Sequence, residues 1–126
     1  MLKVENLSVS YGAINALRGI SFDVKEGEII SLIGSNGAGK TTTLHAISNI
    51  IKKQSGKVIF AGQDVTNVSA DIIVKRNLIQ VPEGRRIFLN MSVKENLEMG
   101  AYTRTDKANI RNDLAKVYEL FPRMKE

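Results

Sequence analysis

The sequence is poor in the residues that build disulfides and metal centres, with no cysteine and one histidine among its 126 residues. The lack of cysteine excludes disulfides and thiolate metal sites, and it fits a reducing compartment. No apolar run approaches the length of a membrane span, and the first residues lack the apolar core of a signal peptide. We therefore expect a cytosolic protein that forms one domain or part of one.

The basic residues are scattered along the chain, although the formal net charge is +5. A basic balance suits anionic ligands or a membrane face. Aromatic residues make up only 6% of the chain, and no basic patch accompanies them, so we expect no nucleic-acid partner. The hydrophobic content of 43% is ordinary for a globular protein.

The most informative segment is residues 34–42, which reads Gly-Ser-Asn-Gly-Ala-Gly-Lys-Thr-Thr. Its spacing is that of a phosphate-binding loop (P-loop), G-x-x-x-x-G-K-[ST]. Glycines let the backbone wrap closely around a polyphosphate, Lys40 would reach the phosphates, and the Thr41 hydroxyl would bind Mg²⁺. A helix that starts near Lys40 would add its positive end to the site. The residues predicted to contact the ligand are Ser35, Asn36, Gly37, Ala38, Gly39, Lys40, Thr41 and Thr42.

The flanking residues support this interpretation over a glycine-rich turn without a ligand. Residues 28–33 form a short, almost unbroken apolar run, which predicts a strand buried on both faces. Leu44, Ile47 and Ile51 then fall on one face of a helix. The sequence thus predicts strand, loop and helix in the order that the phosphate site needs.

The remaining elements follow from local patterns. Alternation predicts strands over residues 2–9 and 20–24, with a turn at 25–28, and we expect further strands at 57–60 and 78–81 and a short helix at 69–75. Ser92 and Glu95 form a capping box that opens a helix from residue 92 to about 101. A second amphipathic helix carries an apolar stripe formed by Ile110, Leu114, Val117, Tyr118 and Phe121.

The P-loop and four other segments together resemble the N-terminal half of an ABC-type ATPase, the ATP-binding subunit of membrane transporters. These segments are residues 10–12, 16–22, 55–65 and 81–97. Within the last one, Pro-Glu-Gly-Arg-Arg-Ile-Phe at 82–88 most resembles the ATPases of branched-chain amino acid importers, and Leu-Phe-Pro-Arg at 120–123 agrees with that narrower match.

The resemblance implies an α/β fold. Its parts are a P-loop NTPase core with a parallel sheet, an N-terminal antiparallel β part, and the start of a helical subdomain, which together make an incomplete domain. We expect residues 1–82 to carry the nucleotide-binding part and residues 83–126 to carry the Q-loop and the first helices of the subdomain. The implied ligands are ATP and Mg²⁺. Tyr11 stands where the family has an aromatic that stacks on adenine, although plain packing is the alternative for this residue.

The resemblance also implies partners and a place in the cell. The family's ATPases bind transmembrane permease subunits and pair head to tail with a second ATPase subunit, at the inner face of the cell membrane, and they energise import of amino acids or similar solutes. Arg85 and Arg86 are equally compatible with contact to a membrane partner and with a solvated basic loop. A P-loop kinase or GTPase suits neither Tyr11 nor residues 82–97.

Several of the family's catalytic parts do not occur in these 126 residues. The sequence has no Leu-Ser-Gly-Gly signature, no apolar strand ending in Asp-Glu, and no switch histidine, since His45 lies within the predicted P-loop helix. Glu83 lies nine residues before Ser92, where most members have the Q-loop glutamine, and Gln80 is three residues too early. Glu83 is either a candidate catalytic-site residue and Mg²⁺ ligand or an exposed loop residue.

The missing parts leave a second hypothesis open. The chain is either the ATP-binding part of an active transporter ATPase or a non-catalytic fragment that binds nucleotide weakly and associates with other copies of itself. Self-association is expected because a buried strand such as 28–33 normally has neighbours on both sides, and open strand edges tend to pair.

Overall fold

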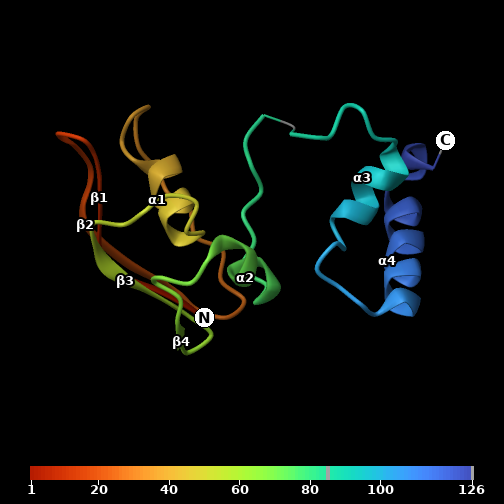
Figure 1. Ribbon diagram of the computed structural model, residues 1–126, viewed down its shortest axis with the longest axis horizontal. Helices are drawn as coiled ribbons and strands as arrows, with labels where there is room; N and C mark the ends of the chain where they lie inside the picture. The colour runs from red at the N-terminus through yellow and green to blue at the C-terminus, as the bar shows by residue number, and fades with distance from the viewer. Residues whose placement is uncertain (85, 126) are drawn as a thin grey trace. The chain divides into compact units, whose positions relative to one another are not determined.

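The structure is a computed structural model that describes residues 1–84 and 86–125 (Figure 1). Arg85, one of the two predicted loop arginines, lies outside the described residues. The chain divides into two compact units, Met1–Gln80 and Val81–Glu126. Each unit is described by itself below.

The first unit is built on a small antiparallel sheet. Its strands are β1 (Leu2–Tyr11), β2 (Ile14–Val24), β3 (Ser55–Phe60) and β4 (Gln63–Asp64), in the spatial order β2-β1-β3-β4. All three pairings are antiparallel. The predicted N-terminal strands and the strand at 57–60 are confirmed, and β2 begins six residues earlier than its alternating pattern indicated.

A bulge explains why the apolar alternation in β1 is only partial. Val4, Leu7 and Val9 are all buried, and the register with β2 shifts between Val4 and Leu7. Asn6 lies at that shift with a left-handed φ of 47°, and its N–H donates to the Ser21 hydroxyl at 2.8 Å. Because a bulge adds one residue to a strand, the next apolar side chain returns to the buried face.

Two short helices, α1 (Lys40–Ile47) and α2 (Ala70–Lys75), lie on one side of the sheet (Figure 1). The helix predicted at 69–75 is therefore confirmed. In α1 the buried side chains are Thr43, Ala46 and Ile47, whereas Leu44 of the predicted stripe is exposed. The prediction was therefore wrong for Leu44 and correct for Ile47, and Ile51 lies beyond the end of the helix, partly buried against the core. The core of the unit consists of Val4, Leu7, Val9, Leu17, Ala46, Ile47, Val58, Phe60, Val65 and Ile73.

Two predicted strands are absent from the described residues. Residues 28–33 form no strand, and Ile29 and Ile33 are 96% and 95% exposed. Residues 78–81 also form no strand, and Val81 is exposed. A strand exists only with a hydrogen-bonded neighbour, and no described segment pairs with either run. The parallel part of the sheet that we predicted therefore does not form in this part of the chain.

The second unit contains α3 (Val93–Met99), α4 (Lys107–Leu120) and a short 3₁₀ helix, Pro122–Met124. The predicted capping box is confirmed: the Ser92 hydroxyl accepts from the Glu95 N–H, and the Ser92 N–H donates to the Glu95 carboxylate at 2.7 Å. These bonds lower the pKa of Glu95 below its usual value of 4.5, and the hydrogen bond from the Ser92 backbone makes the largest contribution. The predicted second helix is also confirmed, although Phe121 lies just beyond its end and is exposed.

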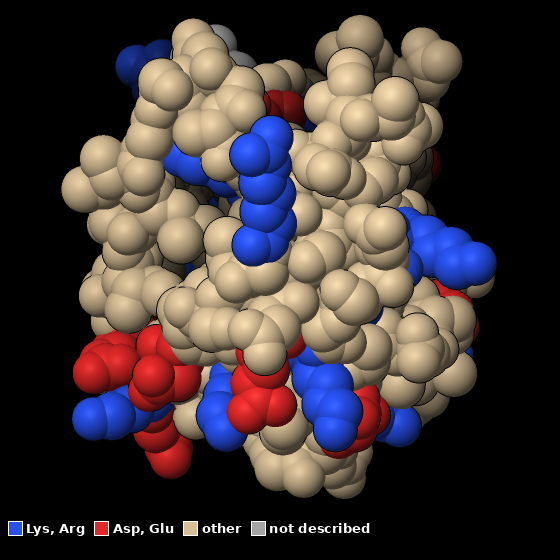
Figure 2. All heavy atoms as spheres, turned by 90° about the vertical axis from the view of Figure 1, so that its left-hand side faces the viewer, with Lys and Arg blue, Asp and Glu red and all other residues tan. Residues whose placement is uncertain are grey.

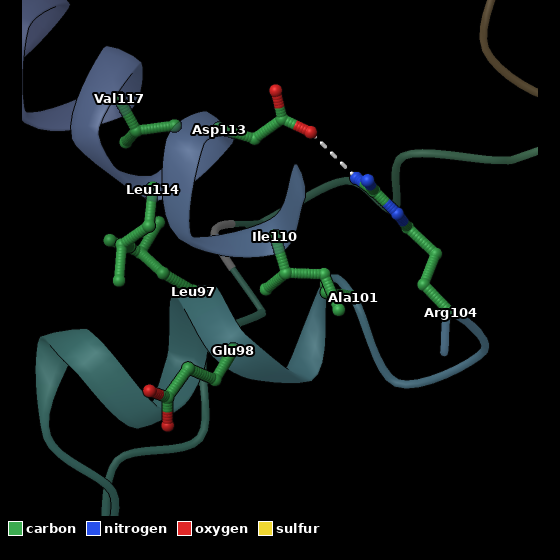
Figure 3. Close-up of a pocket in the computed structure, with 9 residues that line it drawn as sticks. Leu97, Glu98, Ala101, Arg104, Ile110, Asp113, Leu114 and Val117 are labelled. Atoms are coloured by element: carbon green, nitrogen blue, oxygen red, sulfur yellow. Dashed lines mark hydrogen bonds and ion pairs between the residues drawn. The ribbon is translucent and has the colours of Figure 1, made fainter. Parts of the chain in front are cut away.

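A shallow groove of about 170 Å³ lies between α3 and α4 (Figure 3). Its apolar walls are Leu97, Ala101, Ile110, Leu114 and Val117. At one end Arg104 donates to Asp106 at 2.6 Å and to Asp113 at 2.8 Å. These bonds lower the pKa of both carboxylates, with the Arg104 hydrogen bond as the largest cause in each. The ion pairs therefore tie the loop before α4 to the helix itself.

Candidate nucleotide site

The loop before α1 has a backbone that only glycine adopts easily. Gly37 and Gly39 have φ values of 86° and 87°, in the left-handed region that side chains disfavour. A Cβ on Gly39 would lie 2.6 Å from Leu17 Cδ2 and 2.9 Å from the Ala16 carbonyl oxygen, whereas a Cβ on Gly37 would meet nothing within 4 Å. The last residue of the loop is thus packed directly against β2, and its middle is open to solvent.

Lys40 holds the loop together from inside. Its Nζ donates to the Gly34 carbonyl at 2.6 Å and to the Ser35 carbonyl at 2.7 Å. An ammonium group has three donors, so one remains for a ligand. The Ala38 N–H closes the turn by donating to the Ser35 carbonyl at 3.1 Å. Among the described residues, no carboxylate forms an ion pair with Lys40.

The first turn of α1 supplies further donors. The first intrahelical bond runs from the Thr43 N–H to the Gly39 carbonyl at 2.8 Å, so the N–H groups of Lys40, Thr41 and Thr42 precede it and have no helical acceptor. Thr41 is exposed, and Thr42 is half-buried. Sequence reasoning missed Thr43, which is buried and whose hydroxyl also donates to the Gly39 carbonyl at 2.8 Å. The signal in the sequence was a threonine four residues after the last loop glycine, because at this spacing a Ser or Thr hydroxyl can donate to the carbonyl four residues earlier.

The charge around the loop favours an anion. No acidic residue occurs between Glu28 and Asp64, a stretch that contains the loop, α1 and β3. On the face of the molecule viewed in Figure 2, most of the acidic side chains in sight gather at the lower edge. No cluster of three potential metal ligands occurs in residues 1–84 and 86–125. The loop therefore carries the positive charge of Lys40 in a stretch without acidic residues, and the phosphate and metal roles predicted for Lys40 and Thr41 stay predictions.

Tyr11 lies at the end of β1, next to the two-residue turn that joins it to β2. Its side chain is 50% exposed, and its partner across the hairpin is Ile14. The hairpin continues into Ala16 and Leu17, the two residues that a Cβ on Gly39 would meet. Its role in stacking stays a prediction, and the half-exposed ring is available for it.

The other candidate residues lie outside the loop. Gln80 accepts a hydrogen bond from the Ser48 hydroxyl at 2.9 Å, at the C-terminal end of α1, so its amide is engaged away from the loop. Glu83 and Arg86 are exposed residues of the second unit, and their predicted roles stay predictions. His45 is half-buried within α1.

The C-terminal end of α1 is anchored by a separate polar network. Asn49, with a left-handed φ of 55°, donates through Nδ2 to the carbonyls of Val65 at 2.8 Å and Val68 at 2.6 Å. Lys53 Nζ donates to Asn49 Oδ1 and to the Ala46 carbonyl, and burial lowers the pKa of Lys53, partly opposed by Asp64. The helix that carries Lys40 and Thr41 is therefore fixed at both ends.

The fold and the loop define the class: this is an α/β protein with a P-loop. Residues 17–125 match the ABC transporter family, and the chain belongs to that family. The fold class predicted from the sequence, a P-loop NTPase fold with an antiparallel N-terminal part, is thereby confirmed. No helix in the described part of the chain is long and apolar enough to cross a membrane.

Two relatives show which members of the family the chain is similar to. It is 42% identical over 126 residues to the high-affinity branched-chain amino acid transport ATP-binding protein BraG of Pseudomonas aeruginosa, covering 100% of this chain and 54% of BraG. It is 38% identical over 104 residues to the molybdate/tungstate import ATP-binding protein WtpC of Pyrococcus horikoshii, covering 82% of this chain and 29% of WtpC.

A solved structure agrees with these relatives. An ATP-binding subunit of an ABC transporter superimposes with a TM-score of 0.84 at 28% identity, over 99% of this chain and 51% of that one. The chain thus spans about half the length, or less, of the relatives it matches. The predicted resemblance to the ATPases of branched-chain amino acid importers is confirmed by the family match and by the similarity to BraG.

Proposed function

We propose that this chain binds Mg-ATP at the loop before α1 and forms part of the ATP-binding subunit of an ABC importer. The observation that carries the proposal is the arrangement around Lys40. Its ammonium group lies within a glycine loop, has a third donor left, and is followed by the unbonded N–H groups of a helix start.

Each part of the loop has a defined task in this proposal. The backbone from Ser35 to Gly39 surrounds the phosphates, and Lys40 supplies a positive charge and a hydrogen bond to them. The Thr41 hydroxyl binds the Mg²⁺ that accompanies ATP, and Thr42 adds a second hydroxyl beside it. The Mg²⁺ held in this way would neutralise part of the phosphate charge. Tyr11 stacks on the adenine.

Hydrolysis needs further groups than this chain carries. The loop provides positioning and electrostatic stabilisation, which are the main contributions of a protein to phosphoryl transfer, but the family's acidic strand end and signature do not occur in the 126 residues. Glu83 at the Q-loop position would add one carboxylate. We therefore expect binding of Mg-ATP with negligible turnover by this chain alone.

The similarity to BraG supports an amino acid as the imported solute, while WtpC, at 38% identity, serves molybdate and tungstate import. We propose an amino acid importer, a permease partner in the membrane and a second ATPase subunit. The protein would then lie in the cytoplasm, against the inner face of the membrane. The exposed residues 28–33 favour a second candidate, a non-catalytic fragment that binds nucleotide weakly.

Titration calorimetry of the 126-residue chain with Mg-ATP tests the proposal. Lys40→Ala removes the charged hydrogen bond to phosphate, worth about 1.5–3 kcal/mol, so we expect a roughly ten- to hundredfold weaker Kd. The matched control is Lys52→Ala, which makes the same charge change at an exposed lysine beyond the other end of α1. Equal Kd values for Lys40→Ala and wild type would refute the proposed site.

Phosphate release tests the expectation that this chain alone does not turn over ATP. We expect steady-state release by the wild-type chain to equal that of Lys40→Ala, since the loop alone positions ATP without completing the catalytic groups. Release clearly above that of Lys40→Ala would show that the chain hydrolyses ATP by itself.

A further inference from the structure

We propose that Asn36, in the middle of the loop before α1, is a site of spontaneous deamidation, and that its conversion to isoaspartate disables the loop. The modification itself does not depend on the proposed function. Its effect on ligand binding rests on that function, because it assumes that Mg-ATP lies in this loop.

The sequence sets Asn36 apart from the other asparagines. Deamidation begins when the backbone nitrogen of the next residue attacks the side-chain amide carbon, and a side chain on that next residue hinders the approach. Asn36 precedes Gly37, and no other asparagine in the sequence is followed by glycine. The others precede leucine, alanine, isoleucine, valine, methionine or aspartate, so each of them carries such an obstacle.

The structure leaves both reacting residues accessible. Asn36 and Gly37 form the centre of a turn, which the Ala38 N–H closes by donating to the Ser35 carbonyl at 3.1 Å. Both central residues are exposed, and a Cβ on Gly37 would meet nothing within 4 Å. Within the part of the chain that the structure describes, neither the Asn36 side chain nor the Gly37 N–H forms a hydrogen bond.

The turn also tolerates the rotation that the attack requires. The peptide between Asn36 and Gly37 must rotate to bring the nitrogen to the side-chain carbon. Turns of types I and II differ by such a rotation of the central peptide, while the bond between their ends remains. Gly37 has a φ of 86° and permits the change, because glycine adopts either sign of φ.

Two other asparagines show the opposite situation. Asn49 Nδ2 donates to two backbone carbonyls, at 2.8 and 2.6 Å. Asn96 Nδ2 donates to the Phe88 carbonyl at 3.0 Å, and its Oδ1 accepts from the Phe88 N–H at 2.8 Å. Bonds of this kind hold the amide away from the nitrogen of the following residue. The structure and the sequence therefore single out the same asparagine.

The reaction needs water as its only co-reactant. The Gly37 nitrogen loses its proton and bonds to Asn36 Cγ, the bond from Cγ to Nδ2 breaks, and Nδ2 leaves as ammonia. Water then opens the resulting cyclic imide at one of its two carbonyl carbons. Opening at Cγ gives aspartate in a normal chain. Opening at the backbone carbonyl carbon gives isoaspartate, whose main chain runs through Cγ and is one methylene longer.

Isoaspartate would change the loop in two ways. The extra methylene lengthens the path that follows Ser35, whereas Lys40 fixes the start of the loop through the Gly34 and Ser35 carbonyls at 2.6 and 2.7 Å. The new carboxylate also places a negative charge in a stretch without acidic residues, which opposes the binding of phosphates. We therefore expect a chain with isoaspartate in the loop to lose its Mg-ATP site.

The modification is tested by incubating the chain without ligand at mildly alkaline pH and mapping its peptides by mass spectrometry. We expect Asn36 to convert before any other asparagine, and faster as the pH rises, because the attacking nitrogen must lose its proton. Gly37→Ala should slow the conversion, since the new Cβ hinders the attack. The matched control is Asn90→Gln, which removes another exposed asparagine and should leave the rate at Asn36 unchanged. Earlier conversion of another asparagine, or equal rates in wild type and Gly37→Ala, would overturn the inference.

Calorimetry of the same samples tests the effect on the loop. The number of Mg-ATP sites per chain should fall in step with the isoaspartate content, measured by enzymatic methylation of isoaspartate. Asn36→Gln, compared with its own fresh sample, should lose no sites, because a glutamine would have to close a larger ring. Unchanged binding in a sample rich in isoaspartate would overturn the effect on the loop. Equal binding by fresh wild type and Lys40→Ala would refute the proposed function and leave the mapped modification standing.

Discussion

Replacing Gly39 with alanine should damage the first unit far more than the same change at Gly37. Both glycines have almost the same φ, 87° and 86°, so both substitutions place an L-residue in the left-handed region. That conformation costs about 1–2 kcal/mol for a residue with a Cβ. The two sites differ only in what the new methyl group meets.

At Gly37 the methyl group meets nothing within 4 Å, so the backbone term is the whole cost. At Gly39 it would lie 2.6 Å from Leu17 Cδ2 and 2.9 Å from the Ala16 carbonyl oxygen. The leucine side chain can rotate, but the carbonyl belongs to β2, whose pairing with β1 fixes it. Overpacking of this kind typically costs about 1–3 kcal/mol more.

The measurement is the free energy of unfolding by urea, followed by circular dichroism. We expect Gly37→Ala to lose about 1 kcal/mol and Gly39→Ala about 3 kcal/mol. Gly39→Ala should also weaken Mg-ATP binding beyond its effect on stability, because the Thr43 N–H and hydroxyl both bond to the Gly39 carbonyl. Equal losses of stability for the two variants would refute the proposed packing of the loop against β2.

Three further predictions concern other parts of the chain. Tyr11→Ala should weaken Mg-ATP binding by about 1–3 kcal/mol, whereas Tyr11→Phe should have almost no effect because the ring makes the contact. Equal Kd values by calorimetry for Tyr11→Ala and wild type would mean that Tyr11 has only a packing role. The chain should self-associate through the exposed residues 28–33, so its apparent mass by ultracentrifugation should rise with protein concentration. The Ile29→Lys variant should have a lower apparent mass than wild type at the same concentration. A constant monomer mass for wild type would contradict this prediction. The Ser92–Glu95 capping box should be fully stabilising above pH 4.5 and should weaken as the pH falls through the lowered pKa of Glu95. A titration of the Glu95 carboxyl by NMR with a midpoint at or above 4.5 would contradict its hydrogen bonds to Ser92.

Local patterns in the sequence were sufficient where neighbours in the chain decide the structure. The capping box at Ser92 uses residues three apart, and α2 and α4 depend on helical spacing within one segment. The strands of the antiparallel part pair with segments that the described chain contains. These elements were predicted correctly for that reason.

Local sequence patterns failed where the structure depends on a neighbouring strand that is distant in the sequence or lacking among the described residues. The apolar run at 28–33 has the composition of a buried strand, but burial depends on neighbours that no local pattern reveals, and Ile29 and Ile33 are exposed. The bulges at Asn6 and Ala16 were not visible in the sequence either, since both follow from how β1 and β2 align. The glycine loop was predicted as a motif, while its contact with Ala16 and Leu17 required the fold.

The internal bonds of Lys40 have a consequence for the speed of ligand association. Because Nζ already holds the Gly34 and Ser35 carbonyls, the loop keeps its curvature before any ligand arrives. Association then needs no slow ordering step, and the observed rate in a stopped-flow experiment should rise linearly with ATP concentration instead of levelling off. Shortening the side chain at this position would release the loop, and the same plot should then curve toward a plateau set by loop reordering.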